Sequence, residues 1–267
     1  MPMRLYYSIF ILYALILSSC ASIYAPQQAL NVPLFSKARE FQGTFQYGFY
    51  SLKVQAAVAV TNHVALSVNG VQVNYASKNN FTQYQYQNLY EGTVGYYTAN
   101  KSKSVLFEVF LGYGQGEGNY RDNTNPKDEI KNDHAQYGKY VQYVFQPTIG
   151  FGFGPVGRKI VQCSFTPRIS YVDFSTFTTP IFNHPYSGFD NTEVTVTNPD
   201  PTLVFQPTTT ARFNFLDNRL FFTLQLGLCV LQHGGTDGDN TPVVTSFPFT
   251  FSSGLGFRLG GLHWGMK

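Results

Sequence analysis

Charged residues are scarce in this chain. Asp, Glu, Lys and Arg make up 12% of its 267 residues, and the formal net charge is only +3. Soluble globular domains carry roughly 25% charged residues, about twice this share. The weak positive charge argues against a nucleic-acid partner, which would need a dense basic surface. Long hydrophobic runs are scarce as well, because only the N-terminal stretch approaches the length of a membrane helix.

Aromatic residues and glycine are abundant instead. The chain holds 25 Phe, 19 Tyr and 24 Gly but a single Trp, and aromatic residues reach 17%. This composition is too apolar and too aromatic for a disordered chain. Together with the shortage of charge and of internal helical spans, it predicts β-structure that faces an apolar environment.

The first twenty residues read as a targeting segment. Arg4 is followed by an apolar run over residues 5–17, which is shorter than the roughly 20 residues of a spanning helix. Leu17-Ser18-Ser19-Cys20 resembles the lipobox of bacterial lipoproteins. The resemblance implies that residues 1–19 are removed and that Cys20 carries the acyl chains, since two or three chains anchor a protein stably. A plain secretory signal with an accidental cysteine is the alternative.

The mature chain divides into two parts. Residues 20–40 contain two prolines and no periodicity, so we expect a lipidated Cys20 and a periplasmic tether. Residues 41–267 form the predicted β-barrel domain. Cys163 and Cys229 fall on opposite faces of their strands, which predicts two thiols rather than a disulfide.

From residue 41 onward, apolar and polar side chains alternate with the period of two that marks strands with one apolar face. Ten segments show it: 41–49, 51–60, 63–75, 90–98, 104–113, 139–153, 159–173, 203–215, 219–231 and 246–259. An eight-stranded version, with 41–60 as one bent strand, stays open. In 63–75 the apolar parity changes at Asn69-Gly70, which indicates a bulge or a tight hairpin, and strand length favours the bulge.

The chemistry of the two faces favours a membrane barrel. The polar face is mostly Gln, Thr, Ser and Gly, whereas the other face is bulky and aromatic. A barrel with lipid outside and a hydrogen-bonded lumen fits this pattern better than a soluble sandwich. A lipid-tethered periplasmic β-sandwich is the alternative architecture.

Connection lengths support the same architecture. Short connections (61–62, 99–103, 154–157 and 216–218) alternate with long polar ones (76–89, 114–138, 174–201 and 232–245). Outer-membrane barrels have short periplasmic turns and long external loops. An up-and-down antiparallel barrel of ten strands then has both termini in the periplasm. Its partners are expected to be outer-membrane lipids and, through the four long segments, surface ligands or envelope proteins.

Three prolines interrupt this pattern. Pro147, Pro167 and Pro207 each follow a Phe-Gln or Phe-Thr pair, and each falls on the outward face by parity. A proline removes a backbone donor from the ladder, so we expect bulges at these positions.

Several segments together resemble small outer-membrane barrel lipoproteins of Bacteroidota. They are the lipobox, Asn31-Val32-Pro33-Leu34-Phe35, residues 55–63, Gln146-Pro147-Thr148-Ile149-Gly150, residues 168–172, and Phe205-Gln206-Pro207 with residues 224–227. The resemblance covers most of the mature chain, through loose motifs. It implies the barrel fold and the outer membrane, and it implies no activity.

The sequence offers little chemistry. It has no nucleophile motif, phosphate loop, dinucleotide fingerprint or His-rich metal pattern, so we expect no catalytic residue, cofactor or metal. A dyad of His134, His184 or His233 with a loop aspartate would make a membrane-rim enzyme, but solvated loop histidines are the simpler interpretation. The spacing of the oxygen ligands in 121–133 matches no EF-hand, and its Lys and Arg would repel a cation. Residues 233–240 are more calcium-like, and they are equally typical of a turn.

Six charged residues face inward by parity: Lys53, Glu91, Glu108, Arg168, Arg212 and Arg258. Charges inside a narrow barrel must pair or be solvated. Because lumens of eight to ten strands are mostly filled by side chains, we predict a lattice of ion pairs that closes the lumen. The sequence therefore predicts a lipid-anchored barrel with a structural or surface-interaction role. A narrow pore is the main alternative.

Overall fold

The computed structural model describes residues 30–48, 51–77, 82–102, 104–123, 133–154, 160–181, 192–196, 201–232 and 249–260. These residues form an all-β structure, and no helix among them is long and apolar enough to cross a membrane. The strands are β1 (Glu40–Gly48), β2 (Ser51–Ala59), β3 (Val64–Ser77), β4 (Thr82–Ala99), β5 (Val105–Asn123), β6 (Asp133–Phe153), β7 (Val161–Ile181), β8 (Thr192–Val196), β9 (Thr202–Phe215), β10 (Leu220–Leu228), β11 (Val230–Gln232) and β12 (Phe249–Gly260).

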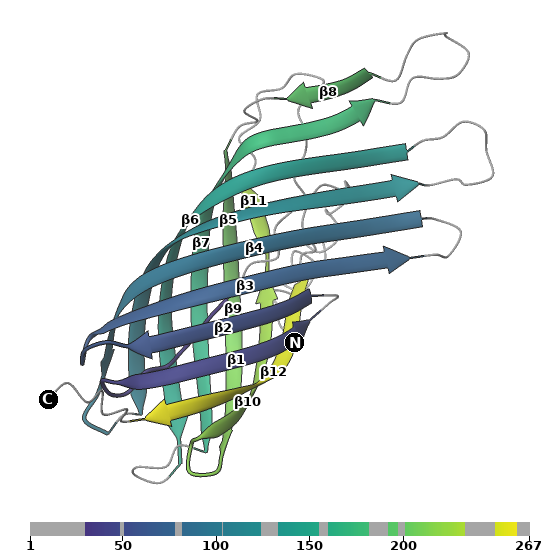
Figure 1. The fold of residues 1–267 in the computed structure, drawn as a ribbon. Coiled ribbons are helices and arrows are strands. Elements are labelled where there is room, and N and C mark those ends of the chain that lie inside the picture. The colour runs from purple at the N-terminus through teal and green to yellow at the C-terminus, as the bar shows by residue number, and fades with distance from the viewer. Residues whose placement is uncertain are drawn as a thin grey trace, which may run out of the picture.

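The strands close into a ten-stranded antiparallel barrel (Figure 1). Consecutive strands pair from β1 to β7, β7 pairs with β9, and β12 closes the ring between β10 and β1. The short β8 adds to the edge of β7, and β11 continues the line of β10 beyond Cys229. Ten strands, rather than the alternative eight, are therefore present, and the sandwich is wrong because the sheet closes on itself.

The two ends of the barrel differ. At one end, which we call the turn end, residues 60–63, 100–104, 154–160 and 216–219 join the strands. Thr61 Oγ1 accepts hydrogen bonds from the backbone of His63 and Val64, which fixes the first of these turns. Both Glu40 at the start of β1 and Gly260 at the end of β12 lie at this end. The opposite end is called the loop end.

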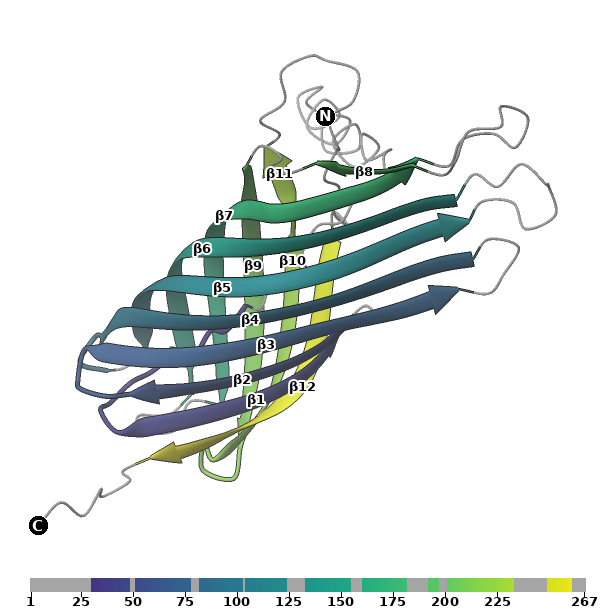
Figure 2. The same ribbon diagram turned by 45° about the horizontal axis from the view of Figure 1, so that its top comes forward.

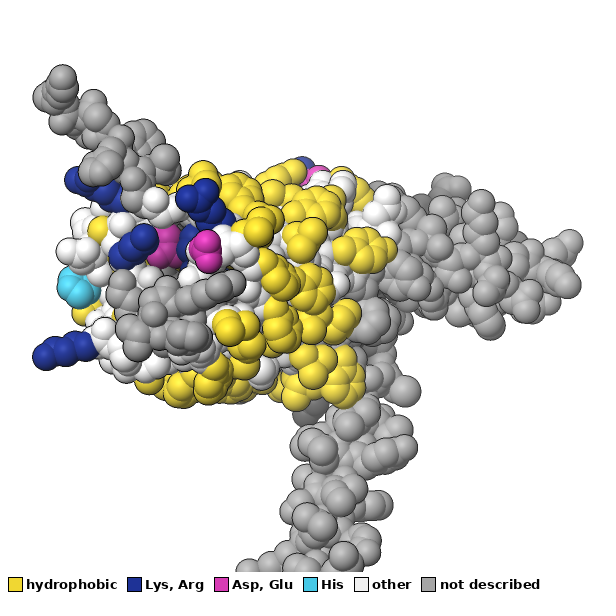
Figure 3. All heavy atoms as spheres, turned by 90° about the horizontal axis from the view of Figure 1, so that it is seen from below, with side chains coloured by type: hydrophobic (Ala, Val, Ile, Leu, Met, Phe, Trp, Pro, Cys, Tyr) yellow, Lys and Arg dark blue, Asp and Glu magenta, His cyan; other side chains and the backbone are white. Residues whose placement is uncertain are grey.

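Apolar side chains cover the outside of the barrel wall on the face that Figure 3 shows. Aliphatic and aromatic residues on alternate positions point away from the lumen and are exposed on every strand of the ring, among them Phe45, Val54, Leu66, Val94, Leu111, Phe145, Phe165, Phe213, Leu226 and Leu255. An exposed apolar belt of this extent needs lipid around it. The fold is therefore an outer-membrane-type β-barrel.

The wall is uneven in height. Strands β4 to β7 contain 18 to 21 residues, whereas β1 and β2 contain nine. Figure 2 shows β3 to β7 running well past β1 and β2 toward the loop end. The predicted loops 76–89, 114–138 and 174–201 are thus partly wrong, since much of each is strand. Segment 232–245 lies almost wholly outside the described residues. A strand of about ten residues crosses a membrane. The additional residues of β4 to β7 therefore extend beyond the membrane, where their polar outward side chains face water.

Strand β3 is regular, and the predicted bulge at Asn69-Gly70 is wrong. Its pairing with β2 and with β4 runs through these residues without a shift in register. The apolar side chains change faces instead: Val68 points outward and is 61% exposed, whereas Val71 and Val73 point inward and are buried. The two valines join an inner apolar cluster with Leu89, Tyr140, Val172, Phe174 and Val204, against which Cys229 packs. The apolar side chains of β3 thus point inward in the part of the strand whose outer face is no longer in contact with lipid.

The three prolines occupy one row across the wall. Pro167 lies directly opposite Pro207, and all three prolines are on the outward face as predicted. The bulges are wrong, because β6 and β7 keep one register on both sides of the row and shift only at Lys139/Tyr140. Their ladder is nevertheless interrupted at residues 146–148 against 166–168. Pro147 and Pro167 have no N–H to donate across this seam.

Residues 30–36 lie inside the barrel. Leu30, Val32, Leu34 and Phe35 are at most 2% exposed. The expectation that a periplasmic tether extends to residue 40 is therefore wrong for this part of it. Strand periodicity could not show this, because residues 30–36 have none and are held by distant residues of the wall. We call residues 30–36 the lumen segment.

Candidate functional site: a charged lumen filled by a peptide segment

The wall of the barrel binds the backbone of the lumen segment. The amides of Gln55 and Gln225 both donate to the Leu30 carbonyl, at 2.7 and 3.3 Å. Gln146 Nε2 donates to the Asn31 carbonyl at 2.5 Å. These are inward side chains of three different strands, and they satisfy peptide groups that would otherwise be buried without partners.

Arg212 holds the middle of the lumen segment. Its guanidinium donates to the carbonyls of Val32 and Pro33, at 2.6 and 2.8 Å, and to Gln42 Oε1 at 3.1 Å. Its Cζ atom also lies 4.0 Å from the ring centroid of Phe221, which adds a cation–π contact. Arg212 is 3% exposed, so these contacts take the place of its hydration.

Two glutamates hold the other end of the segment. Glu108 Oε1 accepts a hydrogen bond from the Phe35 backbone N–H at 2.7 Å, and Glu40 accepts a weaker one from Ser36 N–H at 3.4 Å. Glu108 is fully buried. Six wall side chains therefore make seven hydrogen bonds to the peptide backbone of the lumen segment.

Apolar side chains of the lumen segment fill the space near the turn end. Phe35 packs in a buried cluster with Tyr97, Phe110 and three alanines (Ala57, Ala59 and Ala65). Leu34 packs with Leu106, and its Cδ2 atom lies over Gly150, where an added Cβ would come within 2.7 Å of it. Gly150 thus leaves the room that Leu34 occupies.

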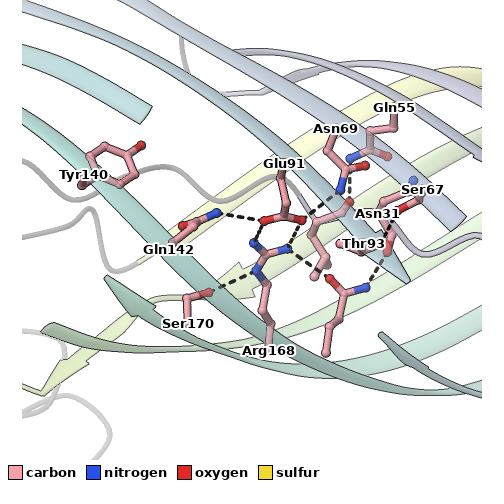
Figure 4. A network of polar contacts seen from close by, with 12 residues as sticks. Asn31, Gln55, Ser67, Asn69, Glu91, Thr93, Tyr140, Gln142, Arg168 and Ser170 are labelled. Atoms are coloured by element: carbon pink, nitrogen blue, oxygen red, sulfur yellow. Dashed lines mark hydrogen bonds and ion pairs between the residues drawn. The ribbon is translucent and has the colours of Figure 1, made fainter. Parts of the chain in front are cut away.

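A second polar layer crosses the lumen at Arg168 and Glu91 (Figure 4). Their closest approach is 2.5 Å, and both side chains are 0% exposed. Arg168 also donates to Gln146 Oε1 and, at longer range, to Ser170 Oγ. Glu91 accepts further hydrogen bonds from Asn69 and Gln142, at 3.0 and 2.8 Å. The ion pair is thus enclosed by neutral amides that complete its hydrogen bonding.

This layer also bridges the seam at the prolines. Where the β6–β7 ladder is interrupted, the Arg168–Gln146 bond and a Thr148–Thr166 hydroxyl bond of 2.9 Å join the same two strands from the inside. Side chains in the lumen therefore replace part of the missing backbone pairing.

The remaining predicted charges occupy other parts of the lumen. Arg258 Nε lies 2.8 Å from Glu40 Oε1 at the turn end. Lys53 is 4% exposed and lies between Gln46 of β1 and Val71 of β3 in the pairing register.

The six predicted charges thus line one lumen without forming one lattice. Glu91 and Arg168 meet each other, Glu108 and Arg212 bind the lumen segment, and Arg258 pairs with Glu40. Sequence reasoning missed Glu40 and the lumen segment itself. The inward glutamines and the conspicuous Asn31–Phe35 motif were the available signals.

Several other predictions fall outside the described residues. Cys20 and residues 1–19, His184, His233 and segment 233–240 are among them, and no side-chain description covers His134. Within the described part, Cys163 lies on the outward face and Cys229 packs against the inner apolar cluster. The same part holds no group of three or more His, Cys, Asp or Glu side chains suited to a metal.

Comparisons with known proteins found similar chains among solved structures. No family model and no curated protein matches the chain. Among solved structures it is similar to the translocator domain of the autotransporter NalP from Neisseria meningitidis, with 10% identity, a TM-score of 0.44, and coverage of 82% of this chain and 86% of that one. The β domain of the Bordetella autotransporter BrkA gives 11% identity, a TM-score of 0.29, and coverage of 82% and 96%.

Proposed function

We propose that the chain is a lipid-anchored outer-membrane β-barrel protein without catalytic activity, with a lumen sealed by its own residues 30–36. Its role is structural or surface interaction. The observation that supports this most directly is the set of seven hydrogen bonds from six wall side chains to the lumen segment. A conducting barrel would keep a continuous water path at this height, where the chain instead buries a peptide and four apolar side chains.

The contact surface in this proposal is the wall that rises beyond the membrane. Outer-membrane barrels have short periplasmic turns and long external loops. In this proposal the loop end is therefore external, and the turn end with the C-terminus is periplasmic. The upper parts of β5 and β6 present outward residues such as Gln115, Glu117 and Lys139, which suit water rather than lipid. This paired wall, with the connections that it carries, offers surface ligands or envelope proteins a contact surface.

Electrical measurement tests the sealed lumen. Purified protein is reconstituted in planar bilayers, and we expect the wild type to show no conductance steps. Arg212→Ala removes two of the seven hydrogen bonds to the lumen segment, so we expect intermittent steps from transient release of that segment. Arg219→Ala, at an exposed turn position, is the matched control and should remain silent. Steady conductance of the wild type would refute the sealed barrel and establish the narrow pore.

Two further experiments test the anchor and the orientation. Mass spectrometry of the N-terminal peptide should find acyl chains on Cys20, and Cys20→Ala should abolish them. A membrane-impermeant maleimide on intact cells should label Lys139→Cys, six residues from the loop end of β6, but not Ser102→Cys at the turn end; both positions are exposed. The reverse labelling would invert the proposed orientation.

A further inference from the structure

The lumen segment has a direction along the barrel. Its C-terminal residue, Ser36, bonds to Glu40 at the turn end, where β1 begins. Its N-terminal residue, Leu30, bonds to Gln55 and Gln225, which lie four and five residues into β2 and β10 from that end. Arg212, at an intermediate height, binds Val32 and Pro33 between them. Traced from Ser36 back to Leu30, the chain climbs from the turn end toward the loop end.

The lumen below Leu30 is already full. Phe35 with Tyr97 and Phe110, Leu34 with Leu106, and the Arg212–Phe221 contact occupy it, and each of these side chains is at most 3% exposed. A second passage of the chain back to the turn end would have to displace this packing. Interiors packed to this degree hold few voids larger than a water molecule.

The wall is lowest beside Leu30. Gln55 lies four residues from Ser51, where β2 ends at the loop end, which is about 13 Å of strand. Figure 2 shows that β1 and β2 end well short of β3 to β7. Because strands of nine residues match a single membrane crossing, the rim at β1 and β2 lies near the membrane–water boundary. Tyr47, one residue from the end of β1, points outward there and is 61% exposed.

From this geometry we infer that the chain leaves the barrel through its loop end, so that the lipid on Cys20 enters the outer, external leaflet of the membrane. Cys20 and Leu30 are ten Cα–Cα steps apart, and an extended chain of that length spans at most about 33–36 Å. This reach covers the 13 Å to the low rim with enough left to place acyl chains in the adjacent leaflet. The route reverses the sequence-based expectation of a periplasmic N-terminus.

The placement of the lipid in the external leaflet rests on the proposed lipid anchor at Cys20. The route of the chain follows from the lumen segment, whether or not Cys20 is acylated. Acylation on this side would fasten the low rim of the barrel to the external leaflet. It would also require the lumen segment to be enclosed as the barrel closes around it, since the acyl chains cannot be threaded through a filled lumen afterwards.

An epitope tag inserted after Ala25 in the full chain tests the route. Antibody added to intact cells should stain this protein as strongly as one with the tag inserted after Asn125, between β5 and β6 at the loop end, and permeabilising the outer membrane should not raise the signal. A tag at Ser102 is the control that should be stained only after permeabilisation. Staining of the Ala25 tag only after permeabilisation would overturn the inference, and so would a tag that stays hidden in both conditions.

The lipid is tested separately. Mass spectrometry of the Cys20 peptide reports the anchor alone, so a surface tag with an unmodified Cys20 would refute the anchor and leave the route standing. A periplasmic tag with an acylated Cys20 would do the opposite. As a second check on the route, we expect a protease cleavage site inserted after Ala25 to be cut by protease added to intact cells, which would separate the N-terminal peptide from the barrel.

Discussion

The ion pair of Arg168 and Glu91 allows a quantitative test of the lumen. Both side chains are 0% exposed, and their closest approach is 2.5 Å. Replacing one partner leaves a buried charge without its counter-charge, which typically costs about 3–5 kcal/mol. We therefore expect Glu91→Gln and Arg168→Met each to lower the free energy of unfolding by roughly this amount.

The double variant discriminates between a coupled pair and two independent sites. In Glu91→Gln/Arg168→Met the buried charges are gone together, while Asn69 and Gln142 retain an amide oxygen to bond. We expect the double variant to be less destabilised than the sum of the single variants by about 2 kcal/mol or more, within the range of measured couplings between contacting residues. Additive effects would mean that the pair contributes no coupling.

Unfolding can be followed by gel mobility. A closed barrel in mild detergent migrates differently on a gel before and after boiling, so folded and unfolded protein give separate bands. The protein is equilibrated in lipid vesicles at a series of urea concentrations, and the fraction in the folded band at each concentration gives the free energy of unfolding. Gly92→Ala is the control for handling, because an added Cβ there meets no atom within 4 Å. Single variants that cost less than about 1 kcal/mol would refute the reasoning, since so small a loss is typical of solvent-exposed pairs.

Two other predictions concern the lumen segment and the seam. Gly150→Val should displace Leu34, whose Cδ2 atom lies 2.7 Å from the added Cβ, and should cost about 1–3 kcal/mol in the same urea assay while Gly92→Ala costs little; equal stability of the two variants would contradict the packing. Pro147→Val with Pro167→Val restores two backbone donors at the interrupted β6–β7 ladder, so we expect a gain of about 1–3 kcal/mol, and hydrogen exchange should show new protection of both amides. An unchanged exchange pattern would show that the missing proline N–H groups do not cause the interruption of the β6–β7 ladder.

The sequence predicted the fold best for the residues that face lipid. A lipid-facing position must be apolar, so outward side chains such as Phe45 and Leu111 mark every second residue and reveal the strands and their number. The rule ends at the membrane boundary. Beyond it the outside is wet and the lumen can be apolar, so the same alternation changes faces, as at Val68 and Val71 of β3. The predicted bulge and the predicted long loops share this one cause.

Polarity of the inner face predicted a filled lumen but not what fills it. Gln55, Gln146 and Gln225 read as a hydrogen-bonded wall because they alternate with apolar residues, yet their partners are carbonyls of residues 30 and 31, which are distant in sequence from two of them. A peptide held through its backbone needs no periodicity of its own. Its side chains need only fit, as Leu34 fits over Gly150. The charges follow the same logic: Arg212 and Glu108 were expected to find opposite charges, and instead each compensates the polar groups of a buried peptide. The lower lumen of this barrel is therefore organised around its own residues 30–36, and the ion pair of Arg168 and Glu91 forms the layer above them.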